Sequence, residues 1–200
     1  MIKVWAFVVA LALAGIGGFI WYVTGSDCDV ALDKNASMAI GGPLELIDEN
    51  GNPVTDTDMF TKPTLLYFGY TFCPDVCPLD NARNAEALDL LLAKGYDAQM
   101  AFISIDPERD TPKVLREFTD YIHPDMTGYT GTPEQIKAAS LAYKTYFAKE
   151  PNGDPEYYLM DHTTFTYLVL PEVGFVEFFR RDETPEGMAE RVGCFIDAAE

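Results

Sequence analysis

Two cysteines, Cys73 and Cys77, follow an apolar run over residues 64–68 (TLLYF) and precede a segment with helical periodicity. Pro63 and Gly69 bound the apolar run, which predicts a buried strand. The N-terminus of a helix stabilises negative charge and so lowers the pKa of a thiol placed there. Because a thiolate attacks disulfides and binds soft metals, this loop is the first candidate for chemistry.

The spacing of the two cysteines narrows the options. Three residues separate them, whereas the dithiol motif of thioredoxins has two. Pro74 and Pro78 argue against a regular helix through both cysteines, so we predict a helix from about Pro78 to Lys94, with residues 73–77 in a tight turn before it. Such a turn brings two sulfurs onto one metal ion, or closes a disulfide when the Cα atoms lie roughly 4.4–6.8 Å apart. A purely structural disulfide, or two inert buried thiols, is the competing interpretation.

A third metal ligand has few candidates, because the chain contains two histidines. His162 is expected to open a strand over residues 162–170, and in a thioredoxin-like sheet the loop before that strand passes beside the cysteine turn. His123 is expected at a helix end, where a cation is favoured, so we predict a capping role for it. Asp161 is expected to point to the opposite strand face from His162, so we predict that it holds the loop rather than binds metal.

Two thiolates and one imidazole suit Cu(I) or Zn(II), and an imidazole also allows Cu(II). A structural zinc site normally has four protein ligands, and the sequence offers three. A metal held by three protein ligands keeps one coordination position open, which suits a site that transfers its metal to another protein.

The order of the predicted elements defines the fold class. Strands separated by helices imply parallel pairing through crossover connections, and hairpins are expected at both ends of the sheet. Thr111–Pro112 and Thr132–Pro133 are start signals for helices, and Gly95 is placed to end one. We therefore predict an α/β, thioredoxin-like fold with an N-terminal β-hairpin. The strands are expected at residues 44–47, 54–55, 64–68, 98–105, 162–170 and 175–179, with a further short strand between the helices that start at Pro112 and Pro133, and a last helix from about residue 184.

The N-terminal segment predicts a single transmembrane helix. Residues 4–23 are almost wholly apolar, which is long enough to cross a hydrocarbon core of roughly 30 Å. Lys3 precedes the run and several aspartates follow it, so the positive-inside rule places residues 1–3 in the cytoplasm. A cleaved signal peptide competes with this interpretation, but its A-x-A pattern falls within the apolar run, at residues 12–14.

These boundaries predict a single-pass protein of the bacterial inner membrane. Residues 4–23 are the expected anchor, residues 24–40 a linker, and residues 41–200 a C-terminal domain in the periplasm. The net charge of −18 repels nucleic-acid phosphates, so we expect no nucleic-acid partner. The periplasm permits disulfides, so the Cys73–Cys77 pair is able to cycle between dithiol and disulfide.

Three separated motifs resemble the Sco/SenC family: residues 67–78 (YFGYTFCPDVCP), 103–112 (ISIDPERDTP) and 161–163 (DHT). The resemblance covers about residues 41–182. It implies a membrane-anchored, thioredoxin-like domain that binds copper, with Cys73, Cys77 and His162 as the ligands. It also implies a role in assembling the binuclear copper centre of cytochrome c oxidase, as copper donor, as thiol reductant, or both. The implied partners are the copper-bearing oxidase subunit and other periplasmic copper chaperones or thioredoxin-like reductants.

Cys28 and Cys194 lie outside this family pattern. We expect Cys194 to act as a small buried hydrophobe. A disulfide between Cys28 and Cys194 is an alternative that the spacing of the cysteines does not support.

Three functions are therefore carried forward. The first is a metal carrier rather than an enzyme. The second is a thiol–disulfide oxidoreductase that uses the same cysteines. The third is a peroxidase in which Thr71 and Arg109 assist an activated thiol. The charged cluster that contains Arg109 is instead expected to cap a helix and fix its loop; it comprises Asp106, Glu108, Arg109 and Asp110.

Overall fold

The computed structural model describes residues 40–151, 154 and 157–199. The predicted anchor over residues 4–23 and the linker up to residue 39 lie outside this part of the chain. Within the described part, no helix combines the length and the apolar character needed to cross a bilayer.

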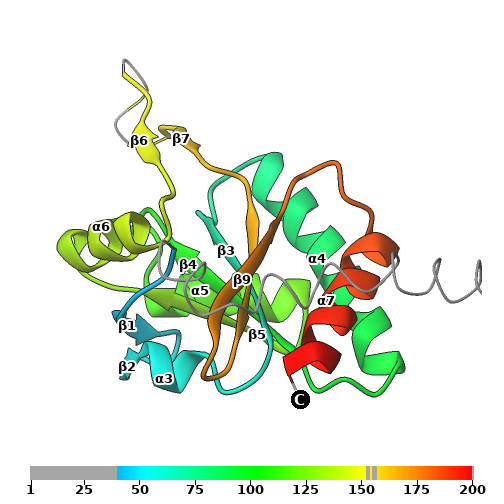
Figure 1. Cartoon of the computed structure of the whole chain (residues 1–200). Coiled ribbons are helices and arrows are strands. Elements are labelled where there is room, and N and C mark those ends of the chain that lie inside the picture. The colour runs from blue at the N-terminus through cyan, green and yellow to red at the C-terminus, as the bar shows by residue number, and fades with distance from the viewer. Residues whose placement is uncertain (1–39, 152–153, 155–156, 200) are drawn as a thin grey trace, which may run out of the picture.

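A seven-stranded mixed sheet forms the centre of the domain (Figure 1), in the order β2-β1-β5-β4-β3-β8-β9. The central strand β3 is parallel to β4 and antiparallel to β8, and β4 is parallel to β5. All residues of β3 are buried, which explains its continuous apolar run. The predicted hairpins at both ends are confirmed as β1–β2 and β8–β9. The strands are β1 (Glu45–Asp48), β2 (Pro53–Thr55), β3 (Thr64–Gly69), β4 (Gln99–Ser104), β5 (Met126–Thr130), β8 (Thr166–Leu170) and β9 (Gly174–Phe179).

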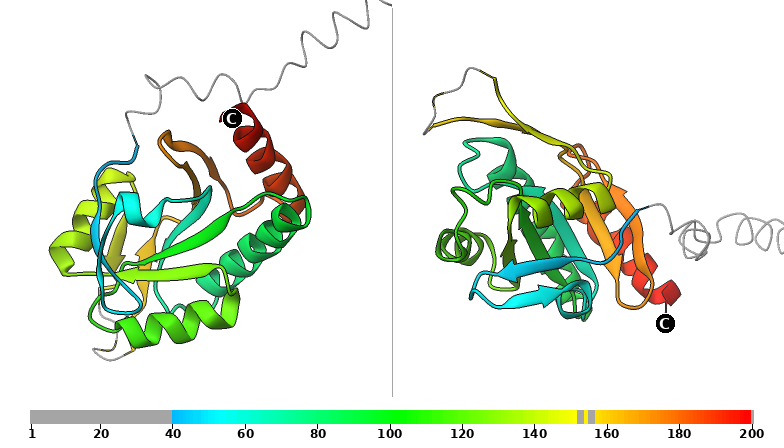
Figure 2. Two further views of the ribbon diagram at one scale, coloured as in Figure 1. Left: turned by 90° about the horizontal axis from the view of Figure 1, so that it is seen from below. Right: turned by 90° about the vertical axis from the view of Figure 1, so that its left-hand side faces the viewer.

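Helices cover both faces of this sheet (Figure 2). α4, α5 and α7 pack on one face, and α6 packs on the other beside β1. The predicted start signals are confirmed, because the hydroxyls of Thr111 and Thr132 accept backbone N–H groups in the first turns of α5 and α6. The helices are α3 (Asp56–Met59), α4 (Val76–Ala93), α5 (Pro112–Ile122), α6 (Pro133–Ala142) and α7 (Pro185–Ala199).

The start of α4 differs from the prediction. The helix begins at Val76 rather than near Pro78, so Cys77 lies in its first turn instead of in a turn before it. Pro78 is accommodated because the N–H groups of a first helical turn have no partner within the helix. The predicted end is confirmed, since Gly95 has a φ of 94° just after the C-cap residue Lys94.

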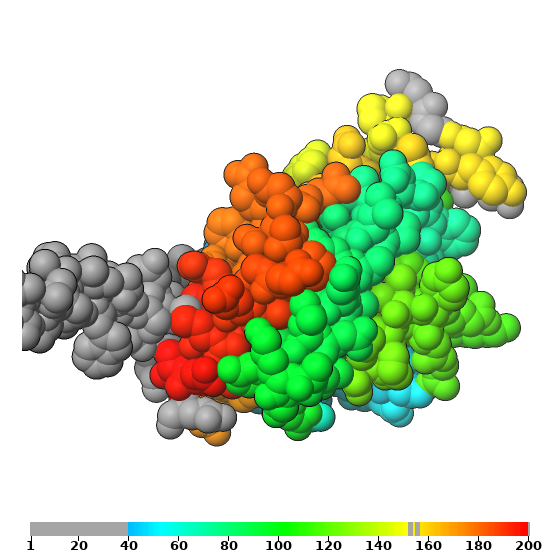
Figure 3. Space-filling model, turned by 90° about the vertical axis from the view of Figure 1, so that its right-hand side faces the viewer, coloured from blue at the N-terminus to red at the C-terminus, as the bar shows by residue number. Residues whose placement is uncertain are grey.

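The predicted strand over residues 162–170 is wrong, because the chain forms two strands there. β7 (Met160–His162) pairs antiparallel with β6 (Phe147–Lys149) in a separate two-stranded sheet, and β8 begins only at Thr166. We call the strand pair β6–β7 the arm; it projects from the domain next to the start of α4 (Figures 1 and 3). At its base the N–H of Thr163 donates to the carbonyl of Tyr146 at 2.9 Å. His162 therefore ends the arm rather than opening a central strand.

Candidate metal centre

The structure brings together the three side chains that the sequence singles out. Cys73 lies in the loop between β3 and α4, Cys77 is the second residue of α4, and His162 ends the arm. Their ligand atoms all lie within 4.8 Å of one another, and Cys77 Sγ is 3.4 Å from His162 Nε2. In the described part of the chain, this is the one such group of metal-binding side chains. Cys77 is fully buried and His162 half-buried, while Cys73 is 8% exposed.

The sulfur of Cys73 occupies the N-terminus of α4. Asp75, the N-cap residue, makes no side-chain capping bond, and the N–H of Cys77 donates to Cys73 Sγ at 3.3 Å instead. The thiol of Cys77, followed by the backbone N–H groups of Cys77 and Asp75, stabilises negative charge on this sulfur. These bonds outweigh burial and lower the pKa of Cys73 to about 3. The Cys73 thiolate, together with burial, raises the pKa of Cys77. The reduced pair therefore holds one thiolate and one thiol at neutral pH.

This charge state predicts the pH dependence of alkylation. In the reduced protein, the rate at which iodoacetamide modifies Cys73 should stay within about twofold between pH 5 and pH 8, because the thiolate fraction does not change there. A thiol with an ordinary pKa of about 8.5 slows about tenfold per pH unit below that value. Site-resolved mass spectrometry of quenched time points measures the rate. A tenfold fall per pH unit at Cys73 contradicts the assignment.

The ring of His162 is oriented by the chain around it. Its Nδ1 lies 2.9 Å from the carbonyl oxygen of Thr163, which only accepts, so Nδ1–H is the donor and Nε2 is left free to face the sulfurs. The ring stands edge-on to the rings of Tyr67 and Tyr70, with centroids 6.2 and 5.9 Å away. The N–H of Met160 donates to the hydroxyl of Tyr70 at 3.2 Å, which ties the arm to the cysteine loop.

Gly69, the last residue of β3, is required by the close approach of Cys77. A Cβ added at Gly69 would lie 2.9 Å from Cys77 Sγ and 3.0 Å from the ring of Phe102. Sequence reasoning used this glycine only as a strand boundary. Its position directly before the cysteine loop is the sequence feature that could have indicated this steric requirement.

A Gly69→Ala variant should therefore displace Cys77 Sγ and lower the free energy of unfolding by about 1–3 kcal/mol, the usual cost of overpacking a core. Urea denaturation measures the stability, and chelator competition should show weakened copper binding. Gly51→Ala is a poor control because of its positive φ, so Ala199→Gly at the exposed end of α7 serves instead for a change of one methyl group. Unchanged stability and unchanged copper binding in Gly69→Ala would refute the steric argument.

A buried carboxylate fixes the cysteine loop to the end of β4. Asp110 is fully buried and accepts hydrogen bonds from the N–H of Thr71 at 3.1 Å, the hydroxyl of Thr71 at 2.6 Å and the hydroxyl of Ser104 at 2.6 Å. Burial raises its pKa. The predicted loop-fixing role of the charged cluster is thus confirmed for Asp110.

The groups that a peroxidase would need are bound to other partners. The hydroxyl of Thr71 donates to Asp110, as described above. Arg109 pairs with Asp106 and donates to the carbonyl of Tyr158 at 3.0 Å. Its guanidinium also lies over the ring of Tyr158, 3.6 Å from the centroid. Both side chains stabilise the loop structure, which leaves the peroxidase hypothesis without a supporting contact.

The remaining residues of interest lie away from the centre. His123 is the C-cap residue of α5, as its predicted position requires, but its ring bonds Asp89 and the N–H of Asp125 rather than the last carbonyls of the helix. Asp161 is exposed and outside the group of metal-binding atoms, in agreement with its predicted face.

Cys194 is half-buried rather than fully buried, packs against the core and is not a free thiol. The bridge considered for it involves Cys28, which lies outside the described residues.

Comparison with known proteins decides the family. The SCO1/SenC family matches residues 32–197. Protein SenC of Rhodobacter capsulatus is 57% identical over 164 residues, which cover 82% of this chain and 74% of the relative. The chain belongs to the SCO1/SenC family. The mitochondrial SCO1 homolog 1 of Arabidopsis thaliana is 40% identical over 77% of this chain, which spans 46% of that longer protein.

Solved SCO1/SenC structures share the fold. Arabidopsis thaliana ScoI with copper bound has a TM-score of 0.75 at 39% identity, covering 80% of this chain and 99% of that one. Bradyrhizobium japonicum ScoI, also with copper bound, has a TM-score of 0.71 at 39% identity, covering 78% and 99%. The thioredoxin-like fold predicted from the sequence is therefore confirmed for the described domain.

Proposed function

We propose that this domain binds one copper ion through Cys73 Sγ, Cys77 Sγ and His162 Nε2 and passes it to a partner protein. The observation that carries the proposal is the convergence of two sulfurs and one imidazole nitrogen within 4.8 Å, at the base of a projecting arm. Soft thiolates with one imidazole favour Cu(I). Three protein ligands leave a coordination position at which a ligand of the partner can begin the exchange.

The proposed recipient is the copper-bearing subunit of cytochrome c oxidase, whose binuclear centre the copper would help to assemble. Membership of the SCO1/SenC family supports this recipient. We further propose that residues 4–23 anchor the protein in the bacterial inner membrane with the domain in the periplasm. The apolar run and its flanking charges support that arrangement.

Copper-dependent recovery of oxidase activity in a deletion strain tests this function. Full-length wild type should restore activity, whereas Cys77→Ser and His162→Ala should not, at equal protein level in the membrane. His123→Ala is the matched control, because it removes the other histidine of the chain, and it should restore activity. Equal recovery with all three variants would contradict the proposal.

The charge state of the thiols predicts how copper affinity depends on pH. Cys73 is already a thiolate, while the raised pKa of Cys77 keeps it protonated, so Cu(I) displaces about one proton from the pair above pH 7. The affinity constant should therefore rise about tenfold per pH unit between pH 7 and pH 8.5. Two protonated thiols would give about a hundredfold per unit. Chelator competition at several pH values distinguishes the two slopes.

A thiol–disulfide exchange activity is the second candidate, and the unequal exposure of the two sulfurs favours it. Cys73 is a thiolate with 8% of its surface exposed, whereas Cys77 is fully buried. Cys73 would attack one sulfur of a partner disulfide, form a mixed disulfide and release one partner thiolate. Cys77 would then lose its proton, attack Cys73 Sγ and release the second thiolate. The pair is oxidised to a disulfide, and the partner is reduced by two electrons.

His162→Ala separates the two candidates, because imidazole takes no part in the exchange step. If reduction is the function, this variant should still reduce a disulfide of the oxidase subunit and restore activity. If copper transfer is the function, it should fail in the same strain.

A further inference from the structure

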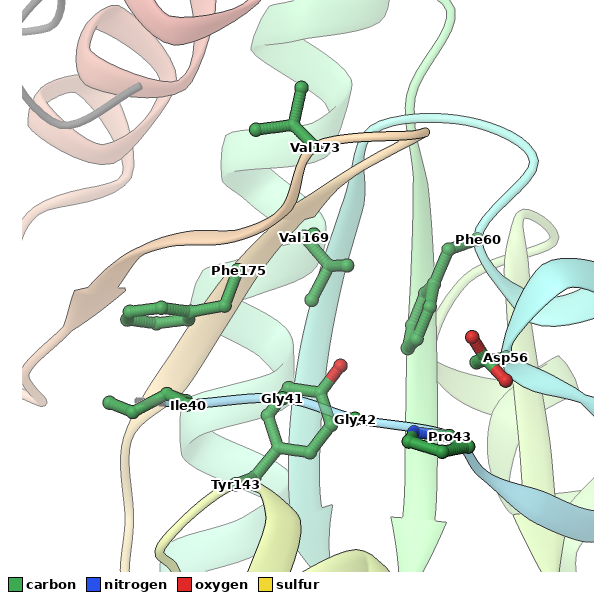
Figure 4. A pocket seen from close by; sticks show the side chains of 11 residues that line it. Ile40, Gly41, Gly42, Pro43, Asp56, Phe60, Tyr143, Val169, Val173 and Phe175 are labelled. Atoms are coloured by element: carbon green, nitrogen blue, oxygen red, sulfur yellow. The ribbon is translucent and has the colours of Figure 1, made fainter. Parts of the chain in front are cut away.

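A hollow lies beside the start of β3, at the opposite end of that strand from the cysteine loop; Figure 4 shows its lining residues. Val169 in its wall pairs with Thr64 at the start of β3, whereas the cysteine loop follows Gly69 at the end of β3. A strand of that length spans roughly 17 Å between those two residues. The hollow has a volume of about 440 Å³, within the usual range of small-molecule sites. We call it the Tyr143 pocket; its lining residues include Ile40, Asp56, Phe60, Tyr143, Val169 and Phe175.

Tyr143 places one polar group in this pocket. The residue is 2% exposed, and its ring packs against the rings of Phe68 and Tyr167, each with a centroid 5.6 Å away. Its hydroxyl has no hydrogen-bond partner among the described residues and points into the pocket (Figure 4). Burial, followed by the charge of Asp56, raises its pKa, so the hydroxyl stays neutral. Phenylalanine would pack equally well, so packing does not account for this hydroxyl.

The charged side chain that lines the pocket is acidic. Asp56 is the only ionisable lining residue apart from Tyr143, and it stands beside Phe60 in Figure 4. One of its oxygens accepts the N–H of Leu44 at 3.2 Å, which fixes the carboxylate in place. The other side chains of the lining are apolar or aromatic, so an anionic ligand would find no cationic side chain among the lining residues. A cation would meet a carboxylate and the faces of aromatic rings.

We propose that the Tyr143 pocket binds a small organic amine with an aromatic body. The apolar body packs between Phe60, Val169 and Phe175, and the ammonium group donates hydrogen bonds to Asp56 and to the hydroxyl oxygen of Tyr143. The pocket shares no residue with the metal centre, so this binding is independent of the proposed copper transfer.

Three probes with the same ring and nearly the same size test the proposal: 2-phenylethylamine, 2-phenylethanol and phenylacetate. Titrations of the full-length chain in nanodiscs, followed by amide NMR shifts, should give a Kd below about 1 mM for the amine. The alcohol should bind about tenfold more weakly and phenylacetate should not bind. Shifts are expected at Gly41 and Gly174 in the pocket, and not at Cys77 in the metal centre.

Two variants test the assigned contacts without removing bulk. Asp56→Asn keeps an acceptor for the N–H of Leu44, and it should reduce the preference for the amine over the alcohol to about twofold or less. Tyr143→Phe keeps the ring and should weaken amine binding about fivefold. His162→Ala should leave amine binding unchanged, so its failure in copper assays and a failure of this proposal are distinguishable.

Three results would overturn the proposal. The first is the absence of saturable shifts in the folded wild-type protein up to about 10 mM amine. The second is phenylacetate binding as tightly as the amine. The third is unchanged amine affinity in both Asp56→Asn and Tyr143→Phe.

Discussion

Replacing His162 by alanine is expected to weaken Cu(I) binding by at least about 100-fold. Mutating a residue that merely hydrogen-bonds a metal ligand typically lowers metal affinity 10–100-fold, and His162 is itself a proposed ligand. Two sulfurs alone remain, and the position left by the imidazole opens to solvent at the base of the arm. His162 is half-buried and its Nδ1 bonds only a neighbouring carbonyl, so the fold should survive the change. Competition against a Cu(I) chelator of known affinity measures the effect, with circular dichroism to verify folding.

His123→Ala is the matched control for this prediction. His123 is 8% exposed and contacts Asp89 at 3.2 Å and the backbone of Asp125, and it takes no part in the metal centre. Its replacement should cost some stability but change copper affinity by no more than about threefold, since distant sites are usually independent. Equal copper affinities in wild type, His162→Ala and His123→Ala would remove His162 from the ligand set.

Replacing Asp110 by alanine is expected to lower the free energy of unfolding by about 3 kcal/mol or more. The change leaves three donors without their acceptor, namely the N–H and hydroxyl of Thr71 and the hydroxyl of Ser104. Each buried donor that loses its partner typically costs about 1–3 kcal/mol; Ser104 is fully buried but Thr71 is half-buried, so the sum is taken at the lower end of this range. Because Thr71 lies two residues before Cys73, the loosened loop should also weaken copper binding, by about tenfold.

Urea denaturation of full-length variants tests the stability part of this prediction. Asp120→Ala provides the control, because Asp120 is an exposed aspartate on α5 and its loss should change stability by no more than about 0.5 kcal/mol. If Asp110→Ala unfolds within about 1 kcal/mol of wild type, the hydrogen bonds of Asp110 do not hold the cysteine loop as described.

The sequence predicts the parts of this centre that depend on local chemistry. The apolar run over residues 64–68 lies within the fully buried strand β3, and Cys73 follows the end of that strand after three residues, so the place of the cysteine loop is visible in the chain. His162 is one of two histidines, and the other lies at a helix end. A third ligand is therefore identifiable by elimination once the fold class is known.

The parts that the sequence does not predict depend on contacts between distant segments. The pairing of Phe147 with His162 is not encoded in either short stretch, so the arm and the break before β8 were missed. The role of Gly69 appears only when Cys77 and Phe102 are placed around it. Tyr143 reads as an ordinary core aromatic until Ile40 and Phe175 are seen to leave a pocket above it.

X-ray absorption spectroscopy of the full-length protein loaded with one equivalent of Cu(I) tests the central claim most directly. We expect a first shell of two sulfurs and one imidazole nitrogen, and loss of the imidazole scattering in His162→Ala but not in His123→Ala. A shell of sulfur atoms alone, or one without sulfur, would contradict the assignment of Cys73, Cys77 and His162 as the copper ligands.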